Sequence, residues 1–372
     1  MRKILWENLS QAFSALDLDW EQKISKDDFA RTFSIMEKDA PIHCPHSHAP
    51  SSPHFSNSLD HGETERPPIY DNLDNCEPGS PRSPIHSLGG HASEVTAVVV
   101  NAEGTRVVSG GSDGTIRVHD AYGNEELCIE SGHLTVRCLA ISIDGLKIIS
   151  GGKDAFIKMW SASSGQLEKK FAGHIGDVFS MVFTRQGKHF LSGGQDKKIR
   201  IWNLNNGNEE AELNGHSGAI YSIAVSGTGT YFASSSADQT IRLWDLSSYM
   251  VLRIFRGHAS LVMAVTFIPG GRWIASVSKD RSLRVWNRGT GEVEKYFYAH
   301  NDDIWAVLAH PDGNRLVTAS SDRKIKVWNL TMGTEVAELD GHNGVILSIA
   351  MCRRGIKLFS ASYDKSVKVW RL

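Results

Sequence analysis

The chain has 372 residues, of which 41% are hydrophobic and 22% charged, a composition typical of globular proteins and sufficient for a sizeable core. Its 40 Lys and Arg residues nearly balance 42 Asp and Glu residues, giving a formal charge of −2, so no long-range field attracts nucleic acid or anionic membranes. We therefore expect no direct binding of nucleic acid. The sequence contains no run of about 18 apolar residues, which argues against membrane insertion.

The cysteines bear on the cellular compartment. Cys44, Cys76, Cys128, Cys138 and Cys352 form no CxxC pair, and an odd number at irregular spacing does not fit a disulfide framework. The first residues become polar too soon for a secretory signal. These features predict a cytoplasmic protein, with the nucleus as the alternative.

Residues 1–38 predict a short helical hairpin. Apolar side chains recur at helical spacing on both sides of an acidic loop, at Leu5, Leu9, Phe13, Leu16, Phe29, Phe33 and Met36. The segment resembles one EF-hand, a helix–loop–helix unit whose loop holds Ca²⁺ through oxygen atoms at fixed positions. The resemblance implies these ligands: Asp17, Asp19, Glu21, the carbonyl of Lys23, Ser25 and Asp28.

Two positions of this loop depart from the EF-hand pattern. Gln22 stands where Gly permits the sharp bend, and Asp28 stands where a longer Glu binds the ion through both oxygens. No second loop pairs with it. The resemblance therefore implies at most a weak Ca²⁺ site, and the alternative is a metal-free amphipathic hairpin that docks on a partner.

Residues 39–84 predict a flexible linker. Nine of the 11 prolines lie between Pro41 and Pro84, among Ser, His and acidic residues and few large aliphatic ones. The stretch from His43 to His48 holds four metal-ligand side chains, but a solvated His-rich linker explains them better. Residues 1–84 carry 8 Lys and Arg and 14 Asp and Glu, a net charge of −6, which leaves 32 against 28, or +4, for residues 85–372.

A repeat of about 42 residues fills the chain from residue 85 to residue 372. Each unit contains Gly-His, or once Ala-His, at His91, His133, His174, His216, His258, His300 and His342. An Asp in a predicted turn follows 21 or 22 residues later, at Asp113, Asp154, Asp196, Asp238, Asp280, Asp322 and Asp364. Four residues before each Asp is Ser or Thr, and six residues after it is Trp, replaced by His119 in the first unit. Short β-branched segments between Gly, Asp and Asn turns predict four strands in each unit.

These units resemble the repeats of the WD-repeat family, whose Gly-His and Trp-Asp signatures frame the four-stranded blades of a propeller. The literal Trp-Asp pair survives only at Trp244-Asp245. The resemblance implies an all-β, seven-bladed propeller of antiparallel blades, preceded by the hairpin and the linker. It also implies that His, Asp, Ser or Thr, and Trp form a buried hydrogen-bond relay in each blade, which agrees with the need of a buried imidazole for two partners.

The register of the repeats predicts how the ring closes. A repeat of this kind begins with the outer strand of the preceding blade, whereas the last repeat ends at Leu372 without an outer strand of its own. We therefore expect Ile85–Leu88 to complete the last blade, which would join the two ends of the propeller and cover an exposed sheet edge.

The resemblance also implies a partner-binding face. In WD-repeat propellers, residues beside the first apolar position of the inner strand, and the residue before the turn Asp, point onto the face where the blade-to-blade loops gather. Carried across by register, the candidates are Arg137, Phe179, Tyr221, Leu261, Met263, Trp305, Leu347 and Tyr363. Large apolar residues on an exposed rim are typical anchors of a protein interface. The alternative is that they fold inwards and cap the core.

Three classes of function compete. We favour a non-enzymatic scaffold that binds other proteins, with a Ca²⁺-responsive N-terminal element as a further hypothesis. The alternative is a substrate-recognition subunit of a ubiquitin ligase, but Trp244-Asp245-Leu246-Ser247 lacks the Arg of the W-D-x-R pattern found in such receptors. Catalysis is not expected, because His, Asp and Ser recur in seven units whereas a reaction needs a single site.

Overall fold

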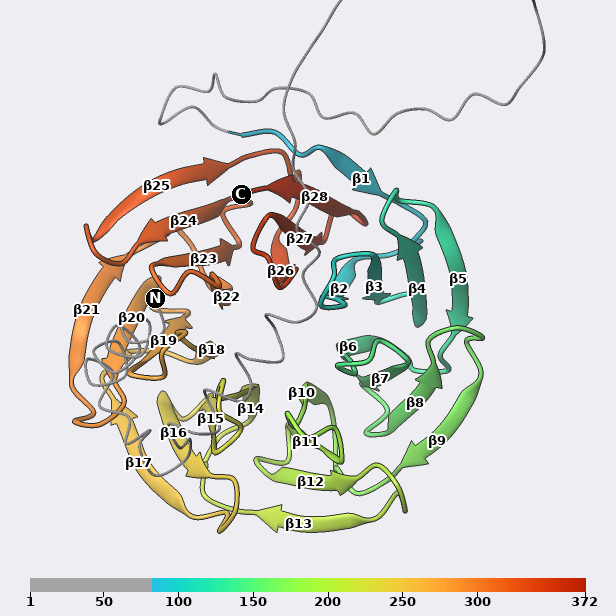
Figure 1. The fold of residues 1–372 in the computed structure, drawn as a ribbon, viewed down its shortest axis with the longest axis horizontal. Helices are drawn as coiled ribbons and strands as arrows, with labels where there is room; N and C mark the ends of the chain where they lie inside the picture. Colours follow the sequence, from blue (N-terminus) through green and yellow to red (C-terminus); the bar gives the residue numbers. More distant parts are fainter. Residues whose placement is uncertain (1–81) are drawn as a thin grey trace, which may run out of the picture. The chain divides into compact units, whose positions relative to one another are not determined.

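The computed structural model describes residues 82–372, which form seven four-stranded antiparallel sheets arranged as blades around a central axis (Figure 1). In six blades the strands run from the axis outwards in chain order, and in the seventh the outer strand is the first strand of the described chain. The predicted all-β, seven-bladed propeller is confirmed. The predicted hairpin at 1–38 and the linker up to residue 81 lie outside the described residues.

The blades are numbered in chain order, and their strands follow. Blade 1 consists of β2 (Val95–Val100), β3 (Arg106–Gly111), β4 (Thr115–Asp120) and β5 (Glu125–Glu130). Blade 2 consists of β6 (Val136–Ile141), β7 (Lys147–Gly152), β8 (Ile157–Ser161) and β9 (Leu167–Phe171). Blade 3 consists of β10 (Val178–Phe183), β11 (His189–Gly194), β12 (Ile199–Asn203) and β13 (Glu209–Leu213). Blade 4 consists of β14 (Ile220–Val225), β15 (Tyr231–Ser236), β16 (Thr240–Asp245) and β17 (Val251–Arg256). Blade 5 consists of β18 (Val262–Phe267), β19 (Trp273–Ser278), β20 (Ser282–Asn287) and β21 (Val293–Tyr298). Blade 6 is β22 (Ile304–Ala309), β23 (Arg315–Ser320), β24 (Ile325–Asn329) and β25 (Thr334–Leu339), and blade 7 is β26 (Ile346–Met351), β27 (Lys357–Ser362), β28 (Val367–Arg371) and β1 (His86–Leu88).

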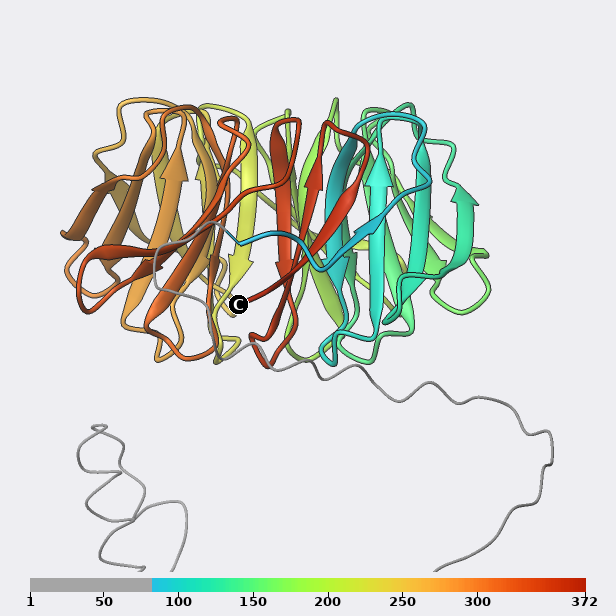
Figure 2. The same cartoon turned by 90° about the horizontal axis from the view of Figure 1, so that it is seen from above.

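The strands run between two faces that carry the loops (Figure 2). One face, here called the blade-joining face, carries the connections between blades, such as 89–94, and the turns between second and third strands, such as 112–114. The opposite face carries the turns between first and second strands, such as 101–105. The turn Asp residues therefore lie on the same face as the Gly-His segments.

The core lies between neighbouring blades. Apolar side chains of one blade pack against the aromatic residues of the next, as where Phe171 of blade 2 meets Phe190 and Trp202 of blade 3 at ring-centroid distances of 5.0 and 5.6 Å. Second strands such as β3 and β11 are almost wholly buried, which explains their apolar and small residues. Each blade thus depends on both of its neighbours for burial.

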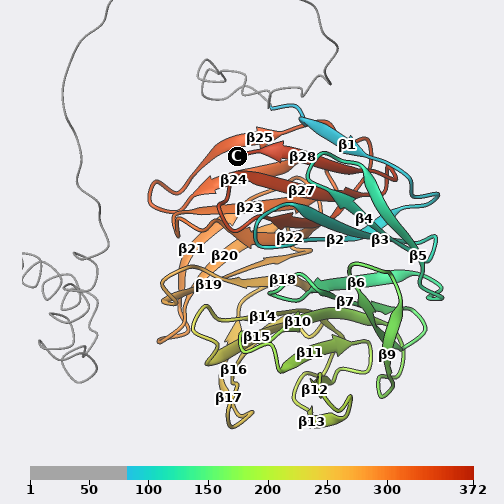
Figure 3. The same ribbon diagram turned by 45° about the vertical axis from the view of Figure 1, so that its right-hand side comes forward.

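The first and last segments of the propeller meet in blade 7. β1 pairs antiparallel with β28, with His86 opposite Val369 and Leu88 opposite Val367, and the two strands lie side by side in Figure 3. Leu88 is buried in a cluster that joins blades 1 and 7. The predicted closure by Ile85–Leu88 is confirmed.

The backbone contacts of the propeller begin at Arg82, earlier than the predicted boundary at residue 85. The Arg82 amide donates to the Glu338 carbonyl at 3.1 Å, and the Asp340 amide donates to the Arg82 carbonyl at 3.2 Å, so Arg82 bridges to the outer edge of β25. Pro84 then lies so close to Gly341 that a Cβ there would be 2.9 Å from the proline ring. The chain therefore touches blade 6 before it completes blade 7.

Candidate functional site

A hydrogen-bonded relay is present in every blade. The distance between His Nδ1 and the nearest carboxylate oxygen of its Asp is 2.6 to 3.1 Å, and between His Nε2 and the Ser or Thr hydroxyl 2.7 to 2.9 Å. In blades 2 to 7 a Trp indole completes the relay at 2.8 to 2.9 Å from the same hydroxyl. All the predicted His and Asp residues of the propeller are therefore brought together in pairs.

The chemistry of the partners sets the direction of each relay. An indole N–H can only donate and a carboxylate can only accept, so Trp donates to the hydroxyl, the hydroxyl donates to His Nε2, and His Nδ1–H donates to Asp. Burial lowers the pKa of His91, His133 and His258, which favours the neutral imidazole that this order requires. Burial alone would raise the pKa of Asp238, but hydrogen bonds from His216 and Thr240 outweigh it and hold that pKa well below its usual range.

Two blades depart from the repeat pattern, with different results. In blade 1, His119 replaces Trp, and its Nδ1 is buried without a partner in the described structure. In blade 6, Ala299 replaces Gly, yet His300 still lies 2.9 Å from Asp322 and 2.8 Å from Thr318. The relay is thus incomplete only in blade 1.

The relay does not offer a catalytic nucleophile. The hydroxyl-bearing residues Ser109, Ser150, Ser192, Ser234, Ser276, Thr318 and Ser360 each have 0% exposed surface, so no substrate reaches them. Their bonds instead tie the blade-joining loop to the second and third strands of the same blade. This arrangement satisfies buried polar groups and stabilises the blade.

A β-bulge recurs at the start of every inner strand. The pairing between first and second strands skips one residue in each blade, and the skipped residues are Thr96, Arg137, Phe179, Tyr221, Met263, Trp305 and Leu347. A bulge re-aims the side chain of the extra residue. The register that the sequence pattern singled out for partner binding is therefore a distinct backbone feature of the fold.

The bulge residues surround one cavity on the axis. The cavity has a volume of about 450 Å³ and is lined by the inner strands of all seven blades, including each of the skipped residues. Side chains from blades 3 to 7 at this position are large and apolar, whereas blades 1 and 2 contribute Thr96 and Arg137. The ring of bulge residues is thus apolar in blades 3 to 7 and polar in blades 1 and 2.

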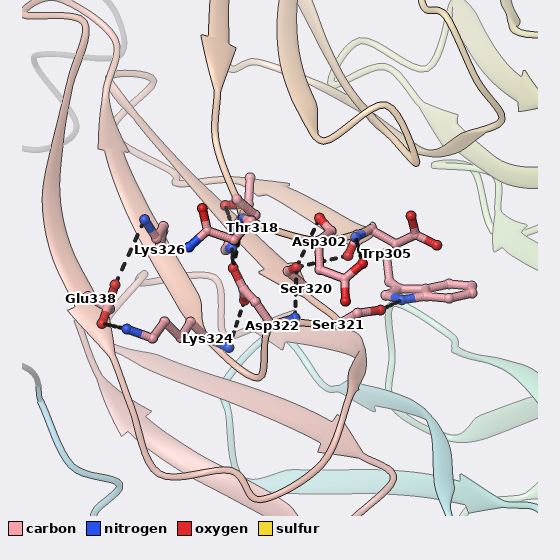
Figure 4. Close-up of polar contacts among 12 residues, drawn as sticks. Asp302, Trp305, Thr318, Ser320, Ser321, Asp322, Lys324, Lys326 and Glu338 are labelled. Atoms are coloured by element: carbon pink, nitrogen blue, oxygen red, sulfur yellow. Dashed lines mark hydrogen bonds and ion pairs between the residues drawn. The ribbon is translucent and has the colours of Figure 1, made fainter.

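Neighbouring bulge residues contact one another or the turn beside them. The rings of Phe179 and Tyr221 lie 5.2 Å apart, and both are half-buried. The indole of Trp305 donates to the Ser321 hydroxyl at 2.7 Å (Figure 4), and the Lys279 ammonium lies 4.6 Å from its ring centroid. These contacts hold aromatic side chains in place at the cavity, which lowers the entropy lost when a partner binds.

The remaining candidates differ in exposure. Met263 departs from the expectation of an exposed rim, because only 7% of its surface is accessible and it contributes mainly to the cavity wall. Leu347 and Leu261 are half-buried, and Tyr363 is 48% exposed in the turn of blade 7. Arg137 reaches the next blade, where its Nε lies 3.1 Å from Asp177. The available apolar surface is therefore narrower than the register alone predicts.

The predicted metal ligands Asp17, Asp19, Glu21, Lys23, Ser25 and Asp28 lie outside the described residues. Within residues 82–372, no three His, Cys, Asp or Glu side chains gather as metal ligands would. The same part of the chain has no helix that could span a membrane. The cavity and its rim therefore remain the candidate site.

Two features of the site were not predicted from the sequence. The contact of Lys279 with Trp305 joins blades 5 and 6, and so does its ion pair with Asp303 at 2.9 Å. The second feature is the bulge, which lengthens the spacing of buried apolar residues from two to three, as from Ile220 to Ile223. This spacing, and the free change from blade to blade of the residue after the first inner-strand valine or isoleucine, are the signals that could have located it.

Comparison with protein-family models supports the repeat assignment along the whole propeller. The model described as "WD domain, G-beta repeat" matches residues 82–120, 125–161, 165–203, 207–245, 250–287, 291–329 and 333–371. A comparison with curated proteins gives no match. Seven consecutive matches cover well over half of the chain, and each spans the outer strand of one blade and the first three strands of the next, so the chain belongs to the WD-repeat family of β-propellers.

Proposed function

We propose that this protein is a non-enzymatic scaffold that binds other proteins through the rim of its central cavity on the blade-joining face. The observation that carries the proposal is the recurring bulge, which presents one variable side chain from each blade at the same cavity. WD-repeat propellers typically bind other proteins.

The chemistry of the rim suits an interface. Phe179, Tyr221, Trp305 and Leu347 offer apolar surface in an arc, and Lys279 and Arg137 place cationic groups beside it. Tyr, Trp and Arg are the residue types that most often dominate binding energy. The relay hydroxyls are fully buried, which supports a structural role for the seven His, Asp and Ser or Thr sets rather than catalysis.

The proposal is tested by Trp305→Ala in the full-length chain. Partners captured with the wild-type protein are identified by mass spectrometry, purified and titrated against both proteins. We expect the substitution to weaken binding by about 2 kcal/mol, roughly thirtyfold, while the melting temperature changes little.

Tyr122→Ala provides the matched control, because Tyr122 is also a large aromatic residue but is 84% exposed in a turn of blade 1 outside the cavity lining. It should leave the affinity unchanged. If Trp305→Ala lowers the melting temperature and partner affinity stays the same, the aromatic arc belongs to the core and the proposal is wrong.

Two narrower hypotheses from the sequence remain separate proposals. A Ca²⁺-responsive contact would reside in residues 1–38, and it predicts that some captured partners change when Ca²⁺ is chelated. A role as substrate receptor of a ubiquitin ligase predicts ligase subunits among the captured proteins. No contact in residues 82–372 favours either one.

A further inference from the structure

The third strand of every blade carries a basic residue at one register: Arg117, Lys158, Arg200, Arg242, Arg284, Lys326 and Lys368. In several blades the outer strand supplies the counter-charge. Arg200 lies 2.7 Å from Glu209 and 2.9 Å from Glu212, and Arg117 pairs with Glu125. In blade 6, Lys326 lies 2.8 Å from Glu335, and Glu338 lies between Lys324 and Lys326 (Figure 4).

Blade 4 keeps the cation and lacks the carboxylates. Arg242 pairs in register with Ile254, whereas Arg200 pairs with Glu212 and Lys326 with Glu338. Val251 stands where Glu209 and Glu335 stand in blades 3 and 6. Within residues 82–372 no carboxylate lies within 4.0 Å of the Arg242 guanidinium, whereas Arg117 and Arg200, whose buried Nε atoms likewise have no hydrogen-bond partner, each have one.

Blade 5 shows how a missing carboxylate can be replaced inside the chain. Arg284 also lacks an acidic partner in the described structure, but its guanidinium carbon lies 5.0 Å from the Tyr296 ring centroid and 6.0 Å from that of Trp286. The electron-rich faces of these rings attract the cation. Among the four arginines at this register, Arg242 alone has neither a carboxylate nor an aromatic face within such distances in residues 82–372.

The residues around Arg242 form a surface of distinct character. We define the β17 face as Arg242, Leu252, Ile254 and Arg256. Ile254 lies opposite Arg242 in register, Arg256 follows two residues later, and Leu252 is the exposed bulge residue that the pairing skips. Leu252 and Ile254 are 50% and 37% exposed, and Arg256 is exposed. β17 contains no Asp or Glu, whereas β5, β9, β13, β21 and β25 each contain Glu.

The edge of blade 4 is open to a further strand. β17 is the last strand of its sheet, so the backbone groups on its outer side pair with no strand in the described structure. An extended segment that adds to such an edge forms backbone hydrogen bonds and places alternate side chains on one face. Those side chains would lie beside Leu252 and Ile254, with Arg242 one strand further in, within reach of a long acidic side chain only.

We propose that the β17 face binds an extended acidic segment of a protein partner. A Glu or Asp of the partner, reaching from outside β17, supplies Arg242 with the counter-charge that Glu209 and Glu212 supply to Arg200 within blade 3, and aliphatic side chains pack on Leu252 and Ile254. The charge-assisted hydrogen bonds of a carboxylate to a half-buried guanidinium are stronger than those of water-exposed pairs. This surface lies on the outer wall of the propeller and is independent of the cavity rim.

The test uses the full-length protein and fluorescence anisotropy. The probe is a short fluorescein-labelled peptide in which Glu and Val alternate, and the reference is the same peptide with Lys in place of Glu. We expect binding of the Glu peptide only, with an affinity that falls as salt is raised. Ile254→Glu, which supplies the carboxylate that blade 3 has in Glu212, should weaken binding at least about tenfold, and so should Arg242→Gln.

Two controls make the outcome decisive. Tyr296→Glu introduces the same negative charge at the equivalent register of blade 5 and should leave the affinity unchanged, and so should Trp305→Ala. Arg242→Gln can also act through lost packing, so melting temperatures are measured for all variants. The proposal is overturned if the wild-type protein does not prefer the Glu peptide, if Ile254→Glu binds it as tightly, or if Tyr296→Glu weakens it equally.

Discussion

Closure of the ring gives a prediction whose size follows from the structure. Removal of residues 1–88 deletes β1, whereas removal of residues 1–81 leaves it in place. β1 buries Leu88, which is only 6% exposed, and the segment donates a backbone hydrogen bond from Ile85 to Val369 at 2.8 Å. Burial of a Leu side chain contributes about 2 kcal/mol, and each of a few strand hydrogen bonds about 1 kcal/mol, so the loss is about 4 kcal/mol.

The assay compares thermal unfolding of the two truncated proteins at one scan rate. A loss of about 4 kcal/mol lowers the melting temperature by roughly 6 °C in a domain of this size. The protein that begins at Arg82 should melt with the same propeller transition as the full chain. Leu88→Ala in the full chain should reproduce about half of the effect. Equal melting temperatures for the two truncations would refute the view that β1 stabilises blade 7.

Three further predictions concern the relay and the N-terminal loop. Ser276→Ala removes the partner of both Trp286 and His258 and should cost about 2 kcal/mol in urea unfolding, whereas Ser235→Ala, which removes a buried hydroxyl without a partner, should cost far less. Burial lowers the pKa of His91, His133 and His258, so below about pH 6.5 the unfolded chain takes up protons that the folded chain does not. The urea concentration at the unfolding midpoint should therefore decrease as the pH is lowered from 7 through 6. The midpoint should decrease again below about pH 4, because the folded state lowers the pKa of the relay carboxylates and they are protonated first in the unfolded chain. A urea midpoint that stays constant as the pH is lowered from 7 to below 4 would contradict both the histidine and the carboxylate prediction. Calorimetry with Ca²⁺ should give a dissociation constant no tighter than about 10⁻⁵ M that is abolished by Asp17→Ala, and nanomolar binding would show that Gln22 and Asp28 do not impair the loop.

Periodicity accounts for how much of the fold was predictable. The spacing of His91, Asp113 and their equivalents places residues at the same point of each blade, and a buried imidazole with two nitrogens restricts the partners to groups of the right chemistry. The last repeat has no outer strand of its own, so another segment must complete its blade. Ile85–Leu88 stands at the position of an outer strand in the repeat pattern and is therefore the expected segment. The backbone bridge of Arg82 to Leu339 was not predicted, because a single bridge leaves no pattern in a proline-rich segment.

Exposure of the candidate site was less predictable than its location. Register assigns Met263 and Trp305 to the same bulge, but the side chain of Trp305 is held by Ser321 and Lys279, whereas that of Met263 is buried at 7% exposure. Such differences depend on rotamers and on neighbours from the next blade, which a one-dimensional pattern does not contain. The Arg242 site was missed for the same reason. The residue opposite Arg242 on the neighbouring strand is Ile254 and not a carboxylate, and this pairing is visible only in the folded sheet.

The seven blades act as internal controls for one another, and the comparison separates structural from recognition roles. A side chain that recurs at a buried position, such as the relay hydroxyl, is needed wherever a blade is built. At the bulge the backbone recurs and the side chain changes, from Thr96 and Arg137 to Phe179 and Trp305, so the fold dictates a position and leaves its chemistry free. At Arg242 the opposite holds, because the cation recurs and only its carboxylate is missing. A partner that supplies that carboxylate would complete in blade 4 the ion pair that blades 3 and 6 form alone.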